Sequence, residues 1–376
     1  MTAKATGMTD SGRQAAKAGK GMRPAGQAPL SPATVRALDE AGLDPADVVR
    51  VVRAALDEDF RYGPDVTSAA TVAGRRVTAE VVAREAGVAA GLPVALAVFD
   101  LLTGSAADGA PGTADRFPGT ADGVPAAVAD TTWDTSGPYG GTLYPTSLAG
   151  GVREAGPRAT VTMLVADGTA VVPEDAVLRV AGDAVAVLGA ERTMLNLVTH
   201  LSGIATATRR FADALAGTGA VVRDTRKTLP GLRSLQKYAV RCGGGENHRM
   251  ALGDAALIKD NHVAAAGGVA AAVHAVRAAA RPGLVIEVEC DSVAQVREAL
   301  EAGARFILLD NMPVPTLREA VAVARAYDGV RLEASGRLQV ANAREVASTG
   351  VDYLSVGGLT HSSRALDLGL DYLGAN

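Results

Sequence analysis

The stretch VIEVECDSVAQVREALEAGARFILLDN, residues 285–311, decides the fold class of this chain. Its apolar run at 285–290 has the length of a buried strand, 293–302 has the apolar spacing of a helix, and 306–310 is a second apolar strand. Short strands that alternate with helices of this length are typical of a parallel sheet or an α/β barrel. The stretch therefore predicts an α/β fold.

The same unit recurs through the second half of the chain. Helices are predicted at 269–280 and 316–326, and the remaining strands at 221–224, 256–259, 331–335 and 353–356. A further strand is expected near Val240. Six clear strands and this seventh fall short of the eight strands of a complete barrel.

The first half of the chain is organised differently. A helix is predicted over 44–57, and strands are predicted over 77–82 and 159–165. Residues 1–32 carry almost no large apolar side chain, so they cannot offset the entropy cost of ordering, and we expect a disordered tail. Residues 104–158 are rich in Gly, Ala, Pro, Asp and Thr, and we expect a flexible insertion there.

A long helix is predicted from Glu191 to about residue 215, because its apolar residues recur at intervals of three and four. Arg192 would lie in its first turn, where a cation opposes the helix dipole at a cost of about 0.3–1 kcal/mol. The position alone leaves two interpretations open. Arg192 is either a solvated surface residue or a cation displayed for an anion.

Composition excludes several classes of protein. The net charge of −4 provides no global positive field for nucleic acid. No apolar run reaches the roughly 18 residues of a membrane span, and the basic N-terminus lacks the apolar segment of a secretory signal. The two cysteines, Cys242 and Cys290, cannot form a disulfide framework. We therefore expect a soluble cytoplasmic protein that binds neither nucleic acid nor membrane.

Polar residues lie at the end of nearly every predicted strand. In a barrel, the carboxyl ends of the strands build the active site, so these residues predict one common site. They are, in chain order, Asp224 with Thr225, Arg226 and Lys227; Lys259 with Asp260, Asn261 and His262; Glu287 and Glu289; Asp310 and Asn311; Glu333, Ser335 and Gly336; and Gly357 and Gly358.

The ligand of this site should be a polyanion. Between Arg223 and Lys259 lie eight basic and only three acidic residues, a local charge near +5. The glycines at 243–245 would let the backbone approach a ligand closely. Gly357 and Gly358 directly follow a strand, as does the late phosphate site of many barrels.

Carboxylates accompany these cations. Glu287 and Glu289 alternate with Ile286 and Val288, so the two glutamates share one face of their strand and would point into the barrel. Buried carboxylates need cations or a metal ion to offset their charge. Acids beside a phosphate site suggest Mg²⁺, which takes one or two carboxylates together with substrate phosphates, whereas no Cys/His spacing suggests zinc.

Several short motifs together resemble the nicotinate-nucleotide pyrophosphorylase (carboxylating) family, also called the quinolinate phosphoribosyltransferase family. The resemblance covers roughly residues 33–100 and 159–373, and the motifs are jointly specific although each alone is weak. They are ERTMLN (191–196), LSGIAT (201–206), DTRKT (224–228), GENHR (245–249), IKDNH (258–262), EVE (287–289), LDN (309–311), EASG (333–336) and SVGGLTHS (355–362).

The resemblance implies an N-terminal α/β sandwich domain at 33–200, an incomplete seven-stranded α/β barrel at 201–360, and a C-terminal segment, 361–376, that packs back on the N-terminal domain. It implies an enzyme that transfers phosphoribose from phosphoribosyl pyrophosphate to quinolinate, forming nicotinate mononucleotide, carbon dioxide and pyrophosphate in de novo NAD biosynthesis. It also implies a head-to-tail homodimer, alone or within a higher oligomer.

The resemblance further assigns roles to residues at matching motif positions. Arg192 would reach the site of the neighbouring subunit, and the two carboxylates of quinolinate would be held by Arg226, His248, Arg249 and Lys259. Catalysis and the pyrophosphate, ribose and Mg²⁺ would involve Lys227, Glu289 and Asp310, with Glu289 and Asp310 as metal ligands. The sugar phosphate would be held by Ser335, Gly336, Gly357, Gly358 and His361.

The chain departs from the family pattern at one site position, and two alternatives stay open. The family usually has a second glycine after Ser335-Gly336, where this chain has Arg337, which could change the phosphate loop or add an anion contact. Lys259 at a strand end also fits a Schiff-base aldolase, although the surrounding charges argue against it. The other alternative is a relative that takes a different anion, including a transport-associated paralogue.

Overall fold

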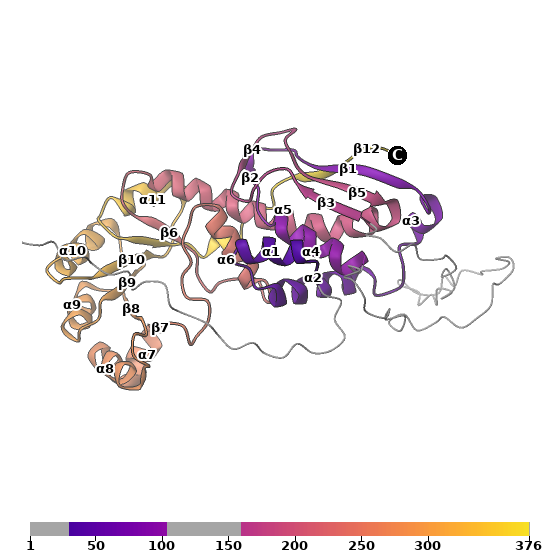
Figure 1. Ribbon diagram of the computed structural model, residues 1–376. Coiled ribbons are helices and arrows are strands. Elements are labelled where there is room, and N and C mark those ends of the chain that lie inside the picture. The colour runs from indigo at the N-terminus through magenta and orange to yellow at the C-terminus, as the bar shows by residue number, and fades with distance from the viewer. Residues whose placement is uncertain (1–29, 104–158, 376) are drawn as a thin grey trace, which may run out of the picture.

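The protein is described by a computed structural model that covers residues 30–103 and 159–375. The predictions for most of the disordered tail and for the 104–158 insertion lie outside the described residues. The described chain forms an antiparallel layer and a parallel layer that share one long helix, α5 (Ala184–Leu215), as Figure 1 shows.

The antiparallel layer is a four-stranded sheet in the order β12-β1-β5-β3, so the last strand of the described ranges pairs with the first. Helices lie against one face of this sheet (Figure 1); they are α1 (Pro32–Glu40), α2 (Pro45–Asp59), α4 (Leu92–Thr103) and α5, and α3 (Val66–Thr71) precedes β1. The strands are β1 (Arg76–Ala83), β3 (Ala159–Met163), β5 (Ala176–Asp183) and β12 (Leu368–Ala375), with a small ribbon of β2 (Gly87–Val88) and β4 (Ala170–Val171) beside them.

Local sequence explains α2, which confirms the helix predicted over 44–57. Asp44 accepts a hydrogen bond from the N–H of Ala46 at 2.9 Å, which satisfies a free donor of the first turn. Val48, Val52 and Leu56 recur every four residues and are buried. The strands predicted in this half are also present, as β1 and β3.

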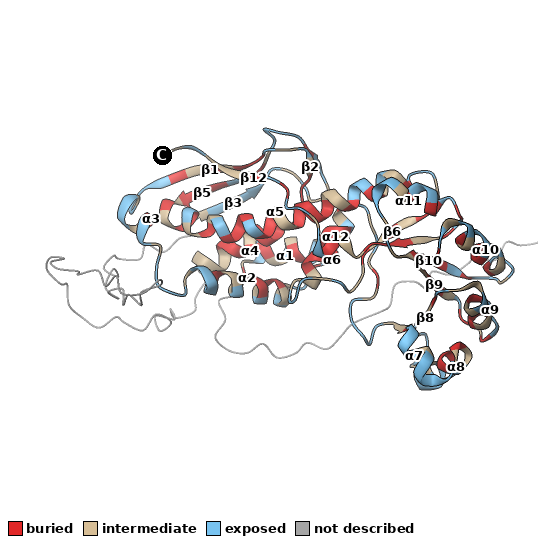
Figure 2. Cartoon of the chain, turned by 180° about the vertical axis from the view of Figure 1, so that it is seen from behind, coloured by how far each residue is buried: buried red, intermediate tan, exposed pale blue. Residues whose placement is uncertain are grey.

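Helix α5 begins seven residues before the predicted start at Glu191. Asp183 caps it by accepting a hydrogen bond from the N–H of Ala186 at 3.1 Å. Arg192 is therefore in the third turn, beyond the reach of the helix dipole, and the argument that it lies unfavourably in a first turn is wrong. In Figure 2 α5 is largely buried, because it packs against both layers.

The parallel layer is a six-stranded sheet in the order β6-β11-β10-β9-β8-β7 with every pair parallel. Its strands are β6 (Val221–Arg223), β7 (Ala256–Ile258), β8 (Ile286–Cys290), β9 (Phe306–Asp310), β10 (Arg331–Ser335) and β11 (Tyr353–Ser355). The helices that alternate with them are α6 (Arg233–Cys242), α7 (Asp260–Ala266), α8 (Val269–Ala279), α9 (Val293–Glu301), α10 (Val314–Ala324), α11 (Val340–Ala347) and α12 (Gly358–His361). The predicted α/β fold is confirmed, and β6 and β7 remain unpaired with each other, so the barrel is incomplete.

The seventh strand predicted near Val240 is wrong, because Val240 lies in α6. Leu235, Tyr238 and Ala239 are buried and have the spacing of one helix face. The short apolar run around Val240 fits a strand as well as a helix, which explains the wrong prediction. The edge of β6 carries instead an isolated parallel bridge between Arg223 and Glu246. Among the helices in the described ranges, none is both long and apolar enough to cross a membrane.

Candidate active site

The register of the parallel sheet places the predicted polar residues on one face. Glu289 and Glu333 both pair with Leu308, and Glu287 pairs with Phe306, two residues earlier on the same strand. Directly paired residues of neighbouring strands point to the same side, so the three glutamates share a face. Val288 on the opposite face is buried, which confirms the predicted alternation.

His248 lies at the centre of a buried network on this face. Its Nε2 is 2.8 Å from Oε2 of Glu287 and 3.6 Å from Oε1 of Glu333. Its Nδ1 accepts a hydrogen bond from the backbone N–H of Arg249 at 2.7 Å. Since Nδ1 is an acceptor, the ring proton is assigned to Nε2, which donates to Glu287.

The same three side chains have the composition of a metal site, with one donor atom from each of His248, Glu287 and Glu333 lying within 4.8 Å of the others. Metal ligation through Nε2 requires that atom to lose its proton. Nδ1 cannot take up the proton while the N–H of Arg249 donates to it. The geometry therefore favours a proton-sharing network over a metal centre at this position.

Glu333 is the most deeply buried member of the network. Its Oε2 accepts a hydrogen bond from Nη1 of Arg223 at 2.9 Å, and Arg223 lies 4.3 Å from the ring centroid of Tyr353. Burial and the neighbouring Glu287 raise the pKa of the Glu333 carboxyl above its usual value, although His248 and Arg223 oppose the shift. The network thus has a group that retains a proton more readily than an ordinary glutamic acid.

Beneath His248 lies a buried ion pair between Lys237 and Asp224, and neither side chain is exposed. Asp224 accepts a hydrogen bond from the N–H of His248 at 2.9 Å, and Lys237 donates to the carbonyl of His248 at 2.8 Å. Burial lowers the pKa of Lys237 and raises that of Asp224, while each partner opposes the other's shift. The pair holds both peptide groups that flank the His248 side chain.

This pair corrects part of the charge argument. Lys237 and Arg223 were counted among eight cations for a ligand, yet each is engaged with a carboxylate of the protein. Arg241 likewise donates to Asn247 Oδ1 at 2.8 Å. The sequence predicted Asp224 as a strand-end site residue and Lys237 as a cation for the ligand, but it did not predict that the two pair with each other beneath His248.

Arg226 and Arg249 are two site cations that keep unused donors, as do Arg53 and Arg223 among the described residues. The Nε atoms of Arg226 and Arg249 are buried and hydrogen bond to no residue in the described ranges. Burial and the nearby Arg226 lower the pKa of Arg249. Arg249 is oriented by donating from Nη1 to the carbonyl of Ala255 at 2.9 Å. Two guanidinium groups that repel each other and keep buried donors free have the composition of an anion-binding site.

Lys259 and Glu289 meet across β7 and β8, with Nζ 2.9 Å from Oε2. Asp310, at the end of β9, accepts a hydrogen bond from Nδ2 of Asn311 at 2.7 Å. The other carboxylate oxygen of Glu289 and of Asp310 hydrogen bonds to none of the described residues. These two oxygens are of the hard type that Mg²⁺ prefers.

The predicted phosphate residues gather around Gly357. A Cβ at this position would lie 2.9 Å from Cδ of Lys227 and 3.5 Å from Nε2 of His361. Thr360 connects α12 with the loop after β6, because its Oγ1 donates to the carbonyl of Lys227 at 2.7 Å. Gly357 follows strand β11 closely, as predicted, and precedes the short helix α12. Lys227 and His361 are therefore neighbours in space.

Ser335 pairs with both Asp310 and Ser355, which brings the end of β10 into the same area. Gly336 is in the left-handed region, and a Cβ there would collide with Asn311. Arg337 also has a positive φ, 53°. The arginine that replaces the family's second glycine thus keeps a backbone conformation that favours glycine.

The glycines at 243–245 have a structural role in place of the predicted approach to a ligand. A Cβ on Gly243 would collide with the carbonyl of Ala205 in α5, and one on Gly245 would lie 2.9 Å from Thr208 of the same helix. These residues are glycines because α5 crosses the loop closely. The expectation that they contact a ligand is therefore unsupported by the packing around them.

Arg192 lies apart from these groups. Its side chain is 65% exposed and meets only Glu191 among the described residues, at 3.8 Å. Helix α5 meets α6 at His200, whose Nε2 is 2.8 Å from Nε2 of Gln236. Arg192 lies eight residues before His200, or about 12 Å away along the helix. Within one subunit the guanidinium is free to contact another molecule.

Comparison with known proteins identifies relatives along most of the chain. Two family models match: the Quinolinate phosphoribosyl transferase N-terminal domain over residues 146–202 and the C-terminal domain over residues 204–371. A nicotinate-nucleotide pyrophosphorylase (carboxylating) of Mycobacterium leprae is 48% identical over 324 residues, which cover 85% of this chain and 95% of that protein. A probable nicotinate-nucleotide pyrophosphorylase (carboxylating) of Bacillus subtilis is 44% identical over 205 residues, 54% of this chain and 70% of that protein.

Solved structures agree with these relatives. NadC from Streptococcus pyogenes superimposes with a TM-score of 0.69 at 33% identity, over 88% of this chain and 99% of that chain. The nicotinate-nucleotide pyrophosphorylase from Francisella tularensis gives a TM-score of 0.69 at 31% identity, over 88% and 97%.

Proposed function

The chain belongs to the quinolinate phosphoribosyltransferase family, and we propose that the carboxyl edge of its parallel sheet holds the two substrates of that reaction. The protein is a pentosyltransferase of de novo NAD biosynthesis. It transfers the phosphoribosyl group of phosphoribosyl pyrophosphate to quinolinate and forms nicotinate mononucleotide, carbon dioxide and pyrophosphate.

Quinolinate is assigned to the guanidinium pair. The observation that carries this assignment is the pair of buried Nε donors on Arg226 and Arg249, which no described residue satisfies. Lys259 stands at the neighbouring strand end, and His248 lies between the glutamates and Arg249. Two carboxylates on adjacent ring carbons offer the two negative charges that this group of cations requires.

Phosphoribosyl pyrophosphate is assigned to the adjacent loops. Its sugar phosphate would lie against the residues at the ends of β10 and β11, namely Ser335, Gly336, Gly357, Gly358 and His361. Lys227, which touches Gly357, is placed to reach the pyrophosphate. This arrangement puts the ribose between the phosphate loops and the guanidinium pair, where the ring nitrogen of quinolinate can attack it.

Glu289 and Asp310 fit a bound Mg²⁺, because each keeps a carboxylate oxygen without a described partner on the same face of the sheet. When bound, Mg²⁺ would offset the negative charge that develops on the departing pyrophosphate. The two carboxylates also lie where they can stabilise positive charge on the ribose as the bond to pyrophosphate breaks.

The remaining chemistry follows from orientation. The ring nitrogen forms the new bond to the ribose carbon, and the pyrophosphate leaves with the electron pair of the old bond. The resulting pyridinium withdraws electrons from the adjacent carbon, so the bond to the carboxyl group breaks, carbon dioxide leaves and a proton takes its place. The protein's main contribution is to hold two mutually repelling anions in a reactive geometry.

The aldolase alternative is contradicted by the family and by the state of Lys259. Its amine is paired with Glu289 at 2.9 Å, whereas a Schiff-base lysine has to be free to attack a carbonyl. A paralogue for a different anion would not need the guanidinium pair, Lys259 and the phosphate loops together. The relative from Mycobacterium leprae also matches over 95% of its own length.

We further propose that the enzyme is a homodimer in which Arg192 of one subunit completes the site of the other, as its exposed and weakly partnered side chain supports. We also propose a cytoplasmic location. The thiols of Cys242 and Cys290 are both free, as in a reducing compartment, and burial raises the pKa of each to about 12, which keeps them unreactive.

An activity assay tests the proposed function. Purified protein is incubated with quinolinate, phosphoribosyl pyrophosphate and Mg²⁺, and nicotinate mononucleotide is measured. Nicotinate in place of quinolinate should support little turnover, because one missing carboxylate leaves buried cations unpaired at a cost of about 2–5 kcal/mol. Arg249→Met should raise the KM for quinolinate strongly, and equal turnover of nicotinate and quinolinate by the wild type would refute the assignment.

A further inference from the structure

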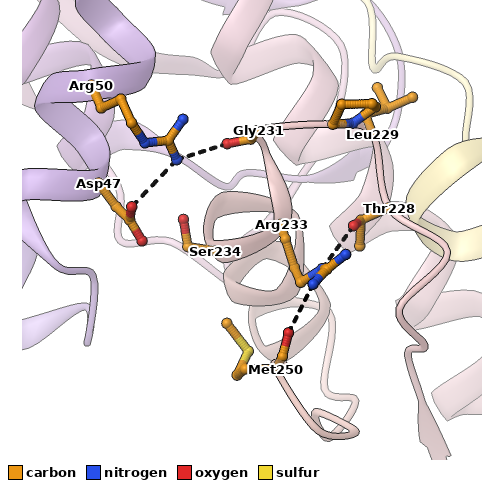
Figure 3. A pocket seen from close by; sticks show the side chains of 9 residues that line it. Asp47, Arg50, Thr228, Leu229, Gly231, Arg233, Ser234 and Met250 are labelled. Atoms are coloured by element: carbon orange, nitrogen blue, oxygen red, sulfur yellow. Dashed lines mark hydrogen bonds and ion pairs between the residues drawn. The ribbon is translucent and has the colours of Figure 1, made fainter. Parts of the chain in front are cut away.

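Arg233, the first residue of α6, connects two loops that are distant in sequence (Figure 3). Its Nε donates to Oγ1 of Thr228 at 3.0 Å, and its Nη1 donates to the carbonyl of Met250 at 3.0 Å. Thr228 directly follows Lys227, and Met250 directly follows Arg249. One side chain therefore bridges the loop that carries Arg226 and Lys227 and the loop that carries His248 and Arg249.

We propose that Arg233 is a positioning residue that sets the two substrate loops relative to each other. Its arm to Thr228 orients Lys227 toward phosphoribosyl pyrophosphate, and its arm to Met250 orients Arg249 toward quinolinate. The inference rests on the proposed function, because it uses the substrates assigned to these two loops.

Helix stability does not explain an arginine at this position. Arg233 follows the N-cap residue Leu232, which provides no side-chain hydrogen bond to the first turn. A cation in the first turn opposes the helix dipole, so an arginine at this position does not stabilise the helix. The planar guanidinium does explain the choice, because it presents several donors in a fixed geometry to two acceptors at once.

A cleft leaves space beside the two loops. An open cleft of about 350 Å³ lies beside Arg233, between α2 and the 228–234 segment, and Met250 lines it as well. Asp254 fixes the turn after Met250 by accepting a hydrogen bond from the N–H of Met250 at 2.5 Å. The carbonyl of the same residue is held by Arg233. With space behind the loops, these hydrogen bonds fix their separation.

Arg50 supplies a matched control on the other wall of the cleft. It donates to the carbonyl of Gly231 at 2.9 Å and to Asp47 at 3.3 Å (Figure 3). It thus contacts the same loop as Arg233 through one carbonyl but hydrogen bonds to neither Met250 nor Thr228. A variant at Arg50 removes a cation and a loop contact without removing the bridge.

The test compares KM values for the two substrates in Arg233→Met, Arg233→Lys, Thr228→Val, Thr228→Ser and Arg50→Met. Thr228→Val should raise the KM for phosphoribosyl pyrophosphate about tenfold, roughly the effect of one lost hydrogen bond. It should raise the KM for quinolinate by a smaller factor, because Lys227 adjoins Thr228 and Arg226 lies one residue further away. Arg233→Met should raise both. Thr228→Ser, which keeps the hydroxyl, and Arg50→Met should change neither KM value. Arg233→Lys can keep at most one of the two hydrogen bonds, so it should still raise at least one KM value.

A double variant tests the connection directly. If Thr228 acts through Arg233, Thr228→Val should add less than about twofold to the KM for phosphoribosyl pyrophosphate in the Arg233→Met background. A fully additive effect would overturn the bridge, as would an Arg233→Met protein with a lowered Tm and two unchanged KM values. If Arg233→Met does not fold, the contrast between Thr228→Val and Thr228→Ser decides. Failure of the wild type to use quinolinate would instead refute the proposed function.

Discussion

Gly357 shows how a missing side chain shapes the site at the scale of one residue. In Gly357→Ala the new Cβ would lie 2.9 Å from Cδ of Lys227, an exposed side chain that can move aside. The fold should tolerate the change, with Tm within about 2 °C of wild type, while displaced Lys227 raises the KM for phosphoribosyl pyrophosphate about tenfold or more. Gly253→Ala, where a Cβ meets nothing within 4 Å, is the control. An unchanged KM would show that Lys227 does not act from its observed position.

Arg337 makes a second prediction at this scale. Its φ of 53° lies in the left-handed region, which costs a residue with a Cβ about 1–2 kcal/mol. Arg337→Gly should therefore increase the free energy of unfolding by about 1 kcal/mol in urea denaturation. Arg337→Asn should have a smaller effect of the same sign, because asparagine tolerates this region. A less stable Arg337→Gly protein would mean that the arginine side chain stabilises the loop.

At the scale of elements, α6 is joined to β6 and the His248 loop by the buried Lys237–Asp224 pair. Lys237→Met leaves Asp224 charged and unpaired, so we expect the free energy of unfolding to fall by about 3–5 kcal/mol. The double variant Asp224→Asn, Lys237→Met removes both charges and should recover much of that loss. Urea denaturation measures both, and a double variant as unstable as Lys237→Met would show that the charge pairing is not what stabilises these elements.

The turn at 250–254 predicts a pH effect. Burial raises the pKa of Asp254, but hydrogen bonds from the N–H groups of Met250 and Ala251 lower it more, so it lies below its ordinary value of 3.8. A lowered carboxyl pKa contributes stability above the unfolded value and loses it as the pH falls through the folded value. Asp254→Asn should therefore lower the urea midpoint at neutral pH, and this difference should shrink below about pH 4. A difference that stays constant with pH would contradict the assignment.

Some helices and strands could be predicted from the sequence, and others could not. Strands β8, β9 and β10 were recognisable because each is a short apolar run that ends in polar residues, and their order along the chain places those residues at one edge. The start of α5 and the helix around Val240 were missed because Ala-rich and short apolar segments fit a helix and a strand alike. The contacts of Asp224 with Lys237 and of Arg233 with Met250 could not be predicted from the sequence. Each joins two different segments of the chain that only the tertiary fold brings together.

The whole molecule is the scale of the Arg192 prediction. If Arg192 acts in the partner's site, Arg192→Ala and Lys259→Ala homodimers should each be nearly inactive. Mixed dimers should regain up to about half the activity per dimer, because one of the two composite sites then has both residues intact. The measurement is activity after subunit exchange, with exchange verified by differently tagged subunits. If activity does not recover after complete exchange, Arg192 does not act in the partner's site.

The pairing of β12 with β1 has a consequence for how the protein is made. Strand β1 at Arg76–Ala83 is translated long before one of its two neighbours, β12 at Leu368–Ala375. At about 5–20 residues per second, roughly tens of seconds separate them, and during that time one edge of β1 has no partner strand. An open edge is a template for pairing with other chains. The nascent protein therefore passes through a period in which it depends on dilution or on a chaperone to avoid aggregation.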